Sequence, residues 1–270
     1  MLLGRAKTNA KRVVFAEADQ LDVLKAAQIA YDEGIAQPIL LGRKETIVEL
    51  MTEIEFDADV PIIDPKSDEE TERKNNYARA YWKKRKRQGV TLYSAEKKMR
   101  ERNYFAAMMV NEGDADALVT GYSRNYPSVV RPMLELIGMA DGVTRVATTN
   151  VMMTQRGPMF LSDTSINIDP SAKDMAKIAR MTSRVAKMFG IESVTAMISY
   201  SNFGSSENPR AEKVREAVAY LHKAYPEMIV DGELQTDFAL NAKMLQDILF
   251  LANTIVEQYD QERIEWVNDY

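Results

Sequence analysis

Residues 12–42, RVVFAEADQLDVLKAAQIAYDEGIAQPILLG, decide the fold class. This stretch begins with a short β-rich run, Arg12–Ala16, and ends with an apolar run that is typical of a buried strand, Pro38–Gly42. Between the two runs, four side chains recur at helical spacing: Leu21, Leu24, Gln28 and Tyr31. Gly34 then tolerates the left-handed conformation that often ends a helix. A strand, a helix and a strand in this order predict two parallel strands joined by a helix.

The same alternation continues along the chain. Further strands are predicted at residues 62–63, 117–120, 193–199 and 228–230. Helices are predicted at residues 44–51, 69–87, 94–111, 127–137, 170–189 and 209–224, and from residue 236 onward. The β-rich runs 146–154 and 159–162 flank a turn, so we expect them to pair antiparallel. The sequence therefore predicts an α/β protein with a mostly parallel, partly mixed sheet.

The pattern changes near Asp141–Gly142, where the β-rich pair begins. A length of 270 residues fits two modest domains, at roughly 100–200 residues per domain. We therefore expect a first α/β subdomain over residues 1–142 and a second over residues 143–270, which includes an atypical C-terminal helix.

Composition and charge exclude several classes of protein. Hydrophobic residues make up 46% of the chain and charged residues 28%, as in soluble globular proteins. A balance of 35 Lys and Arg against 40 Asp and Glu gives a net charge of −5, which argues against a nucleic-acid partner. The chain has no cysteine and one histidine, which excludes disulfide scaffolds, thiolate nucleophiles and Cys/His zinc sites. Chemistry must then use carboxylates, hydroxyls, Arg, Lys or backbone amides.

Membrane insertion and export are not indicated by the sequence. No apolar run approaches the roughly 18–20 residues that span a bilayer. Residues 1–7, MLLGRAK, lack a sustained apolar stretch and a cleavage signal. We therefore expect a cytoplasmic protein without a membrane partner.

Three polar loops follow predicted strands. In residues 121–127, GYSRNYP, small residues let backbone amides approach an anion beside the Arg124 guanidinium. Residues 199–206, SYSNFGSS, are rich in hydroxyls, and residues 231–237, DGELQTD, offer carboxylates and an amide. Taken alone, each loop is more often a helix cap. Together, at the carboxyl ends of strands, they predict a cleft for a small anionic ligand.

The candidate ligand-binding residues in these loops carry hydroxyl, amide, carboxylate or guanidinium groups. They are Ser123, Arg124, Ser199, Ser201, Asn202, Ser205, Ser206, Gln235 and Asp237. The basic run 83–87, KKRKR, follows an acidic helix start and is best interpreted as a solvated helix face, although a site role for one of its arginines stays open. No metal site is expected, because no cluster at ligand spacing is visible, although Asp163, Asp231 and Asp237 carry the carboxylates that Mg²⁺ would need.

Several separate motifs resemble one family. These are residues 113–121 (GDADALVTG), 130–132 (VRP), 197–201 (MISYS) and 230–237 (VDGELQTD). In this order they resemble the phosphate acetyltransferase and phosphate butyryltransferase family. Residues 121–127 and 201–206 resemble in particular the phosphotransacetylase-like C-terminal domain of bacterial hybrid NADP-dependent malic enzymes. The resemblance covers residues 12–247.

The resemblance implies two α/β/α three-layer subdomains like those of isocitrate and isopropylmalate dehydrogenases. It also implies a cleft that holds acetyl-CoA or a related acyl-CoA, phosphate as a second ligand, and a homo-oligomer that is at least a dimer. Free-standing members of the family move an acetyl group between coenzyme A and phosphate. By motif position, the phosphate-binding arginines of the family correspond to Arg85 and Arg131.

Three features depart from the family pattern. Residues 122–125, YSRN, replace a His and Ser/Thr pair of the free-standing enzymes. Residues 248–270 do not match the late segment that bears the presumed catalytic base and a further arginine, so we expect a chain shorter than the complete family domain. No G-x-G-x-x-G motif follows a strand, so NADP is expected only in a malic enzyme domain outside this chain.

Three functions are compatible with this sequence. The first is a regulatory module that binds acetyl-CoA and supports oligomerisation of an enzyme that oxidatively decarboxylates malate. The second is an active phosphate acetyltransferase, and the third is a packing domain with a vestigial cleft. We prefer the first, because the catalytic segment of the family is not matched, and we therefore assign no catalytic residue.

Overall fold

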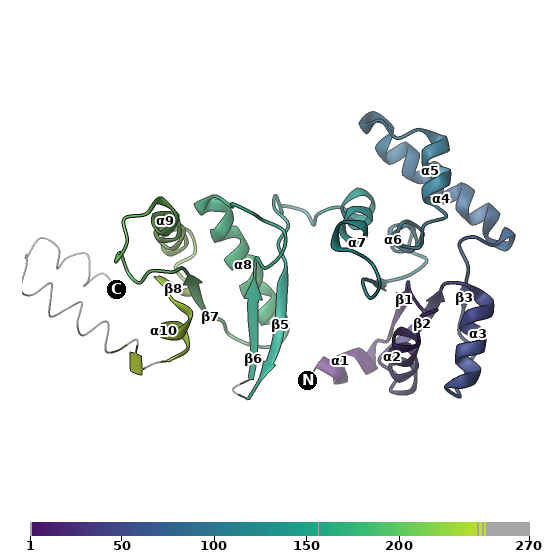
Figure 1. Cartoon of the computed structure of the whole chain (residues 1–270), viewed down its shortest axis with the longest axis horizontal. Coiled ribbons are helices and arrows are strands. Elements are labelled where there is room, and N and C mark those ends of the chain that lie inside the picture. The colour runs from purple at the N-terminus through teal and green to yellow at the C-terminus, as the bar shows by residue number, and fades with distance from the viewer. Residues whose placement is uncertain (1, 156, 242, 245, 247–270) are drawn as a thin grey trace, which may run out of the picture. The chain divides into compact units, whose positions relative to one another are not determined.

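The computed structural model describes residues 2–155, 157–241, 243–244 and 246. The chain divides at Gly142 into two compact units, residues 1–142 and residues 143–270 (Figure 1). Both units contain strands and helices, and both have a hydrophobic core of their own.

The first unit is built around a sheet of four parallel strands. They are β1 (Lys11–Phe15), β2 (Ala36–Leu41), β3 (Ile62–Ile63) and β4 (Ala117–Val119), in the spatial order β3-β2-β1-β4. Helix α2 (Leu21–Asp32) joins β1 to β2, and α3 (Lys44–Glu53) joins β2 to β3. The parallel unit predicted for residues 12–42 is therefore confirmed.

Alternating side chains of β1 and β2 pack into two separate hydrophobic cores. Phe15 and Leu40 lie in the core that α2 and α3 cover, whereas Val14 and Leu41 lie in the core that contains α6 (Arg102–Glu112). Figure 1 shows α2 and α3 on one side of these strands and α6 and α7 (Tyr126–Pro132) on the other. Because successive strand residues face opposite sides, the result is a three-layer α/β arrangement.

Residues 94–111, predicted as one helix, form two. Helix α5 (Leu92–Lys98) is capped by Thr91, whose hydroxyl accepts a hydrogen bond from the Ser94 amide at 3.1 Å. Helix α6 begins at Arg102, whose Nη1 donates to Asp19 Oδ1 at 2.6 Å while Nη2 donates to Oδ2 of the same carboxylate. Asp19 follows β1, so the break anchors the start of α6 at the carboxyl end of the sheet.

The remaining elements of the first unit are mostly short. They are α1 (Leu2–Thr8), α4 (Thr71–Arg85), two 3₁₀ turns (Asp68–Glu70 and Lys86–Gln88) and a π-helical turn (Met133–Ile137). Helix α4 is the longest of them, and it buries Tyr77, Ala78 and Tyr81, whereas Glu72, Arg79 and Lys83 are exposed.

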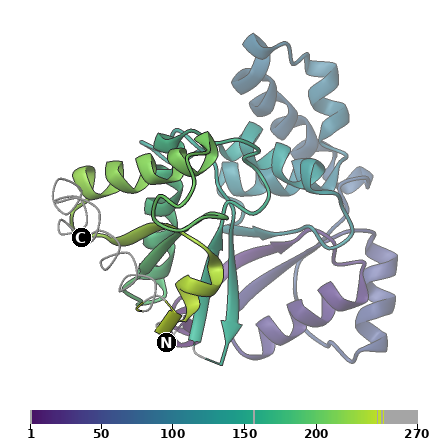
Figure 2. The same ribbon diagram turned by 60° about the vertical axis from the view of Figure 1, so that its left-hand side comes forward.

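The second unit combines an antiparallel hairpin with a parallel pair. Strands β5 (Thr149–Thr154) and β6 (Gly157–Ser162) pair antiparallel, as the turn signal predicts. Strands β7 (Val194–Ile198) and β8 (Ile229–Leu234) pair in parallel. Helices α8 (Ala172–Met188) and α9 (Pro209–Ala224) pack together over a small core that contains Ala176, Leu221 and Val230. Figure 2 shows the hairpin next to α8.

The end of the chain is described only in part. Helix α10 (Thr236–Leu240) begins where the last helix was predicted. The atypical C-terminal helix predicted for the final residues lies outside the described part, which excludes residues 247–270. Of the helices that are described, none has the length and apolar character needed to cross a membrane.

Candidate functional site

The loop after β4 surrounds one buried carboxylate. Glu17, two residues beyond β1, is only 2% exposed. It accepts hydrogen bonds from the backbone N–H groups of Gly121 (2.7 Å), Tyr122 (3.0 Å) and Ser123 (2.7 Å). The hydroxyls of Thr120 and Ser123 donate to the same carboxylate. The amides predicted to approach an external anion are therefore occupied by an internal one.

Burial and hydrogen bonding act on Glu17 in opposite directions. Desolvation raises its pKa, because it disfavours the charged form. Hydrogen bonds from the Ser123 hydroxyl and from three loop amides favour the carboxylate and lower the pKa. The hydrogen bonds outweigh desolvation, and the pKa falls to about 2. Glu17 is thus a fixed negative charge under the loop at neutral pH.

The three predicted anion-binding arginines all belong to the first unit. Arg124 lies in the loop after β4 and Arg131 in α7, and both are exposed. Arg85 lies in the last turn of α4, where its Nε is buried. Within the described part of the chain, none of these guanidinium groups forms a hydrogen bond or ion pair. The exposed guanidinium groups of Arg124 and Arg131 are therefore accessible to a ligand.

The segment that carries Arg131 is held by one glutamate. Glu135, one helical turn further along the π-helical turn, accepts hydrogen bonds from the hydroxyls of Tyr81 (2.7 Å) and Tyr104 (2.8 Å). Lys98 Nζ lies 3.3 Å from the same Oε2. Because Tyr81, Lys98 and Tyr104 come from α4, α5 and α6, three helices fix the position of the segment.

Other candidate sites in the first unit suit an anion less well. An open pocket of about 220 Å³ borders Glu17 and is lined mainly by apolar side chains, among them Phe15, Val23 and Val119. None of its lining residues is cationic. Among the residues described in either unit, no group of three or more His, Cys, Asp or Glu side chains is arranged to hold a metal ion.

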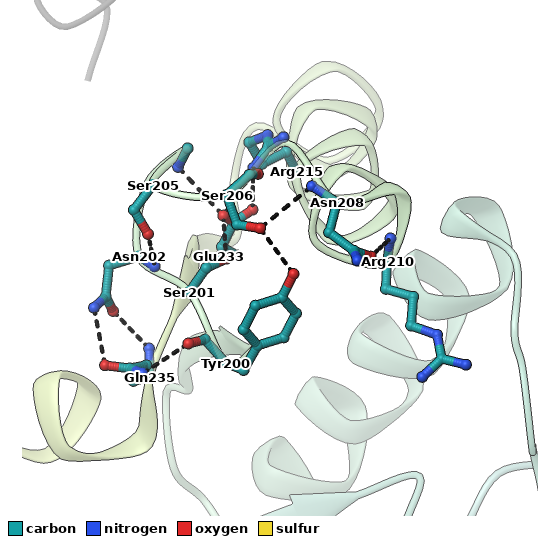
Figure 3. A network of polar contacts seen from close by, with 11 residues as sticks. Tyr200, Ser201, Asn202, Ser205, Ser206, Asn208, Arg210, Arg215, Glu233 and Gln235 are labelled. Carbon is teal, nitrogen blue, oxygen red and sulfur yellow. Dashed lines mark hydrogen bonds and ion pairs between the residues drawn. The ribbon is translucent and has the colours of Figure 1, made fainter.

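The loop after β7 is also held by a buried carboxylate (Figure 3). Glu233 of β8 is fully buried, and its Oε1 accepts hydrogen bonds from Ser201 Oγ (2.6 Å) and the Gly204 N–H (3.2 Å). Arg215 of α9 donates Nη1 to both Glu233 oxygens at 2.8 Å, and to the Ser206 carbonyl at 3.1 Å. Glu233 therefore joins β8 and α9 to this loop.

Side-chain amides close the same loop. Asn202 Nδ2 donates to Gln235 Oε1 at 3.1 Å, and the Gln235 N–H donates to Asn202 Oδ1 at 2.7 Å. Gln235 Nε2 donates to the Tyr200 carbonyl at 2.7 Å, and the Tyr200 hydroxyl lies 2.8 Å from Ser206 Oγ. The Asn202 N–H donates to Ser205 Oγ at 3.0 Å. Since these groups satisfy one another, they set the shape of the loop.

The structure brings together five predicted residues of the second unit. They are Ser201, Asn202, Ser205, Ser206 and Gln235 (Figure 3). Ser199 joins them through its backbone, because its N–H donates to the Leu234 carbonyl at 3.0 Å. Asp237 stands apart and accepts a hydrogen bond from the Phe238 amide at 3.1 Å.

Three organising residues were not among the predicted site residues: Glu17, Arg215 and Glu233. Glu17 directly follows the first predicted strand, and a polar residue at that position of a parallel sheet is a usable signal. Glu233 lies inside the third polar loop, two residues before Gln235. Arg215 gave no signal, because an arginine on an amphipathic helix is normally a solvated charge.

A glycine next to Glu233 gives a testable packing constraint. Gly232 has a φ of 138°, and a Cβ there would lie 2.5 Å from the Met197 carbonyl oxygen. We expect Gly232→Ala to lower the free energy of unfolding by about 1–3 kcal/mol, measured by urea denaturation. Gly204→Ala is the control, since Gly204 has a φ of 85° but no atom within 4 Å of the place its Cβ would take. Equal losses in the two variants would disprove the steric explanation.

Comparison with known proteins covers both units. Residues 1–250 match the family described as phosphate acetyl/butaryl transferase. The NADP-dependent malic enzyme of Haemophilus influenzae is 31% identical over 92% of this chain and 33% of its own length. The Escherichia coli enzyme of the same name is 33% identical over 88% of this chain and 32% of its own length. The chain thus spans about a third of the length of these malic enzymes.

Some phosphate acetyltransferases are similar over more of their own length. A phosphate acetyltransferase of Clostridium acetobutylicum is 33% identical over 88% of this chain and 73% of its own length. A phosphotransacetylase structure from Streptococcus pyogenes superposes with a TM-score of 0.77 at 32% identity, over 91% of this chain and 75% of that one. The family match, the fold and these relatives agree, and the chain belongs to the phosphate acetyl/butaryl transferase family.

Proposed function

We propose that this chain binds acetyl-CoA or a related acyl-CoA and acts as a regulatory module of a larger, malic-enzyme-like protein. One observation carries the proposal: the guanidinium groups of Arg124 and Arg131 are exposed and form no hydrogen bond or ion pair within the described residues. The phosphate groups of coenzyme A offer the oxygens that guanidinium groups bind in planar, charge-assisted pairs.

Similarity to malic enzymes supports the regulatory role. Because the chain spans about a third of their length, malate oxidation and NADP binding would belong to other parts of such a protein. This domain would then supply acyl-CoA sensing and oligomerisation. We expect a homo-oligomer that is at least a dimer, and sedimentation of the purified chain tests this expectation.

Phosphate acetyl transfer is the second candidate function. The observation that favours it is the 73% coverage of the Clostridium acetobutylicum phosphate acetyltransferase. In that reaction a phosphate oxygen attacks the thioester carbonyl, the carbon–sulfur bond breaks, and acetyl phosphate and coenzyme A result. Positioned cations such as Arg85, Arg124 and Arg131 would stabilise the developing negative charge.

Two measurements on the purified chain distinguish these functions. Calorimetric titration with acetyl-CoA tests binding, and an assay of acetyl phosphate formation from acetyl-CoA and inorganic phosphate tests turnover. Binding without turnover is the result we expect from a sensing domain. Turnover would replace the regulatory proposal with the transferase, and the absence of both would leave a packing domain with a vestigial cleft.

Removing an exposed, unpaired arginine tests whether its guanidinium group binds the ligand. We expect Arg131→Ala to weaken acetyl-CoA binding by roughly 1.5–3 kcal/mol, the usual size of a charge-assisted hydrogen bond. Arg79→Ala serves as the control, because Arg79 is an exposed residue of α4 outside the candidate site. Affinity is measured by calorimetric titration. Unchanged affinity in Arg131→Ala would remove this residue from the ligand site.

A further inference from the structure

The loop after β4 has the geometry of an anion-binding nest whose anion belongs to the chain itself. Three successive backbone N–H groups, from Gly121 to Ser123, point at the Glu17 carboxylate. Successive amides that converge in this way form concave sites for anions in many proteins. Here both carboxylate oxygens are used, and the Ser123 hydroxyl adds a further bond.

Neutral donors alone compensate the negative charge of Glu17. The groups that donate to it are the hydroxyls of Thr120 and Ser123 and three loop amides, and no ion pair to Glu17 is found within the described residues. A second anion at this position would meet an uncancelled like charge. An anionic ligand is therefore excluded from the nest. It would have to bind a cationic side chain instead, such as that of Arg124, the residue after the nest.

We infer that Glu17 is the positioning residue of the loop after β4. Its carboxylate fixes the backbone of residues 121–123, so that Arg124, the next residue, is held in a set position for an anionic ligand. Glu17 also occupies the nest and keeps external anions out of it. The inference rests on the proposed function only where acyl-CoA affinity is the readout.

Two substitutions of Glu17 test the inference in different ways. Glu17→Gln preserves the volume of the side chain, but its NH₂ group faces loop donors that need an acceptor. Glu17→Ala removes the carboxylate from the nest and leaves a space that a small carboxylate such as formate can fill. Asp22→Asn is the matched control, because Asp22 is an exposed carboxylate that accepts a hydrogen bond from the Tyr122 hydroxyl, at 2.5 Å, and not from the loop amides.

Two readouts are measured on the full chain, one with ligand and one without. Calorimetry gives the affinity for acetyl-CoA, and hydrogen exchange gives the protection of the amides of residues 121–123. We expect Glu17→Gln to bind acetyl-CoA about tenfold more weakly and to exchange these amides faster. Asp22→Asn should match the wild type in both. Added formate should restore affinity and protection in Glu17→Ala but not in Glu17→Gln, whose side chain fills the nest.

The outcomes separate the inference from the proposed function. Wild-type chain that does not bind acetyl-CoA refutes the proposed function, and amide exchange then decides the inference alone. Unchanged exchange in Glu17→Gln, or formate without effect on a folded Glu17→Ala, overturns it. A variant that loses stability while the folded protein keeps wild-type affinity shows a merely structural role, which also overturns it. If Glu17→Ala does not fold, Glu17→Gln decides.

Discussion

Glu233→Ala should lower the free energy of unfolding by about 3–5 kcal/mol, the range found when one partner of a buried ion pair is removed. The substitution leaves the Arg215 Nη1 with the Ser206 carbonyl as its remaining acceptor. It also leaves the Ser201 hydroxyl and the Gly204 amide without the acceptor they share. The Arg215 side chain is 23% exposed, so water can compensate only part of this loss. Urea denaturation followed by circular dichroism measures the effect.

An exposed ion pair of the same unit provides the matched control. Glu227 and Arg180 approach to 3.5 Å, with the Glu227 side chain 68% exposed. Exposed pairs contribute about 0–1 kcal/mol, so Glu227→Ala should remain within that range. A loss below about 1 kcal/mol in Glu233→Ala as well would show that the buried pair does not hold the loop after β7.

Acid should destabilise the wild-type protein more than Glu17→Gln. The pKa of Glu17 in the folded chain, about 2, lies below its ordinary value of 4.5. A carboxyl with a lowered pKa stabilises the folded state fully above its unfolded pKa, and this contribution disappears as the pH falls toward the folded pKa. The shift corresponds to about 3 kcal/mol above pH 5. The advantage of the wild type over Glu17→Gln should therefore shrink as the pH is lowered from 5 toward 2.

Unfolding free energies of both proteins, measured by urea denaturation at a series of pH values, test this expectation. Asp22→Asn, which removes an exposed carboxylate near the same loop, should run parallel to the wild type. A constant difference between wild type and Glu17→Gln from pH 5 to pH 3 would contradict the lowered pKa.

The sequence predicted those helices and strands whose ends are set by residues close to them in the chain. Residues 209–224 were predicted as a helix and form one, because Pro209 suits the first turn and the Asn208 side chain accepts from the Arg210 amide at 3.0 Å. The β5–β6 hairpin follows from its turn residues in the same way. The break between α5 and α6 depends instead on Asp19, 83 residues before its partner Arg102. No window of local sequence contains that pair.

The candidate site shows the same division. Sequence identified polar loops at strand ends and most of the side chains in them. It did not show whether a given group bonds a ligand or a neighbour, because that depends on partners distant in the chain. Ser201, for example, was predicted to bind ligand, yet its hydroxyl donates to Glu233, 32 residues later. Arg85 and Arg131 were assigned from the family resemblance, because composition and spacing alone do not single out these two arginines.

The two buried glutamates have a consequence for the thermodynamics of association. Each unit uses the carboxylate of one glutamate to hold the loop after a parallel strand. Glu17, just after β1, holds the loop after the neighbouring strand β4, and Glu233, in β8, holds the loop after the neighbouring strand β7. Loops tied in this way are preorganised, so a ligand does not have to freeze backbone torsions when it arrives. The entropy cost of binding should then come mainly from the ligand itself and from the few arginine side chains that it immobilises.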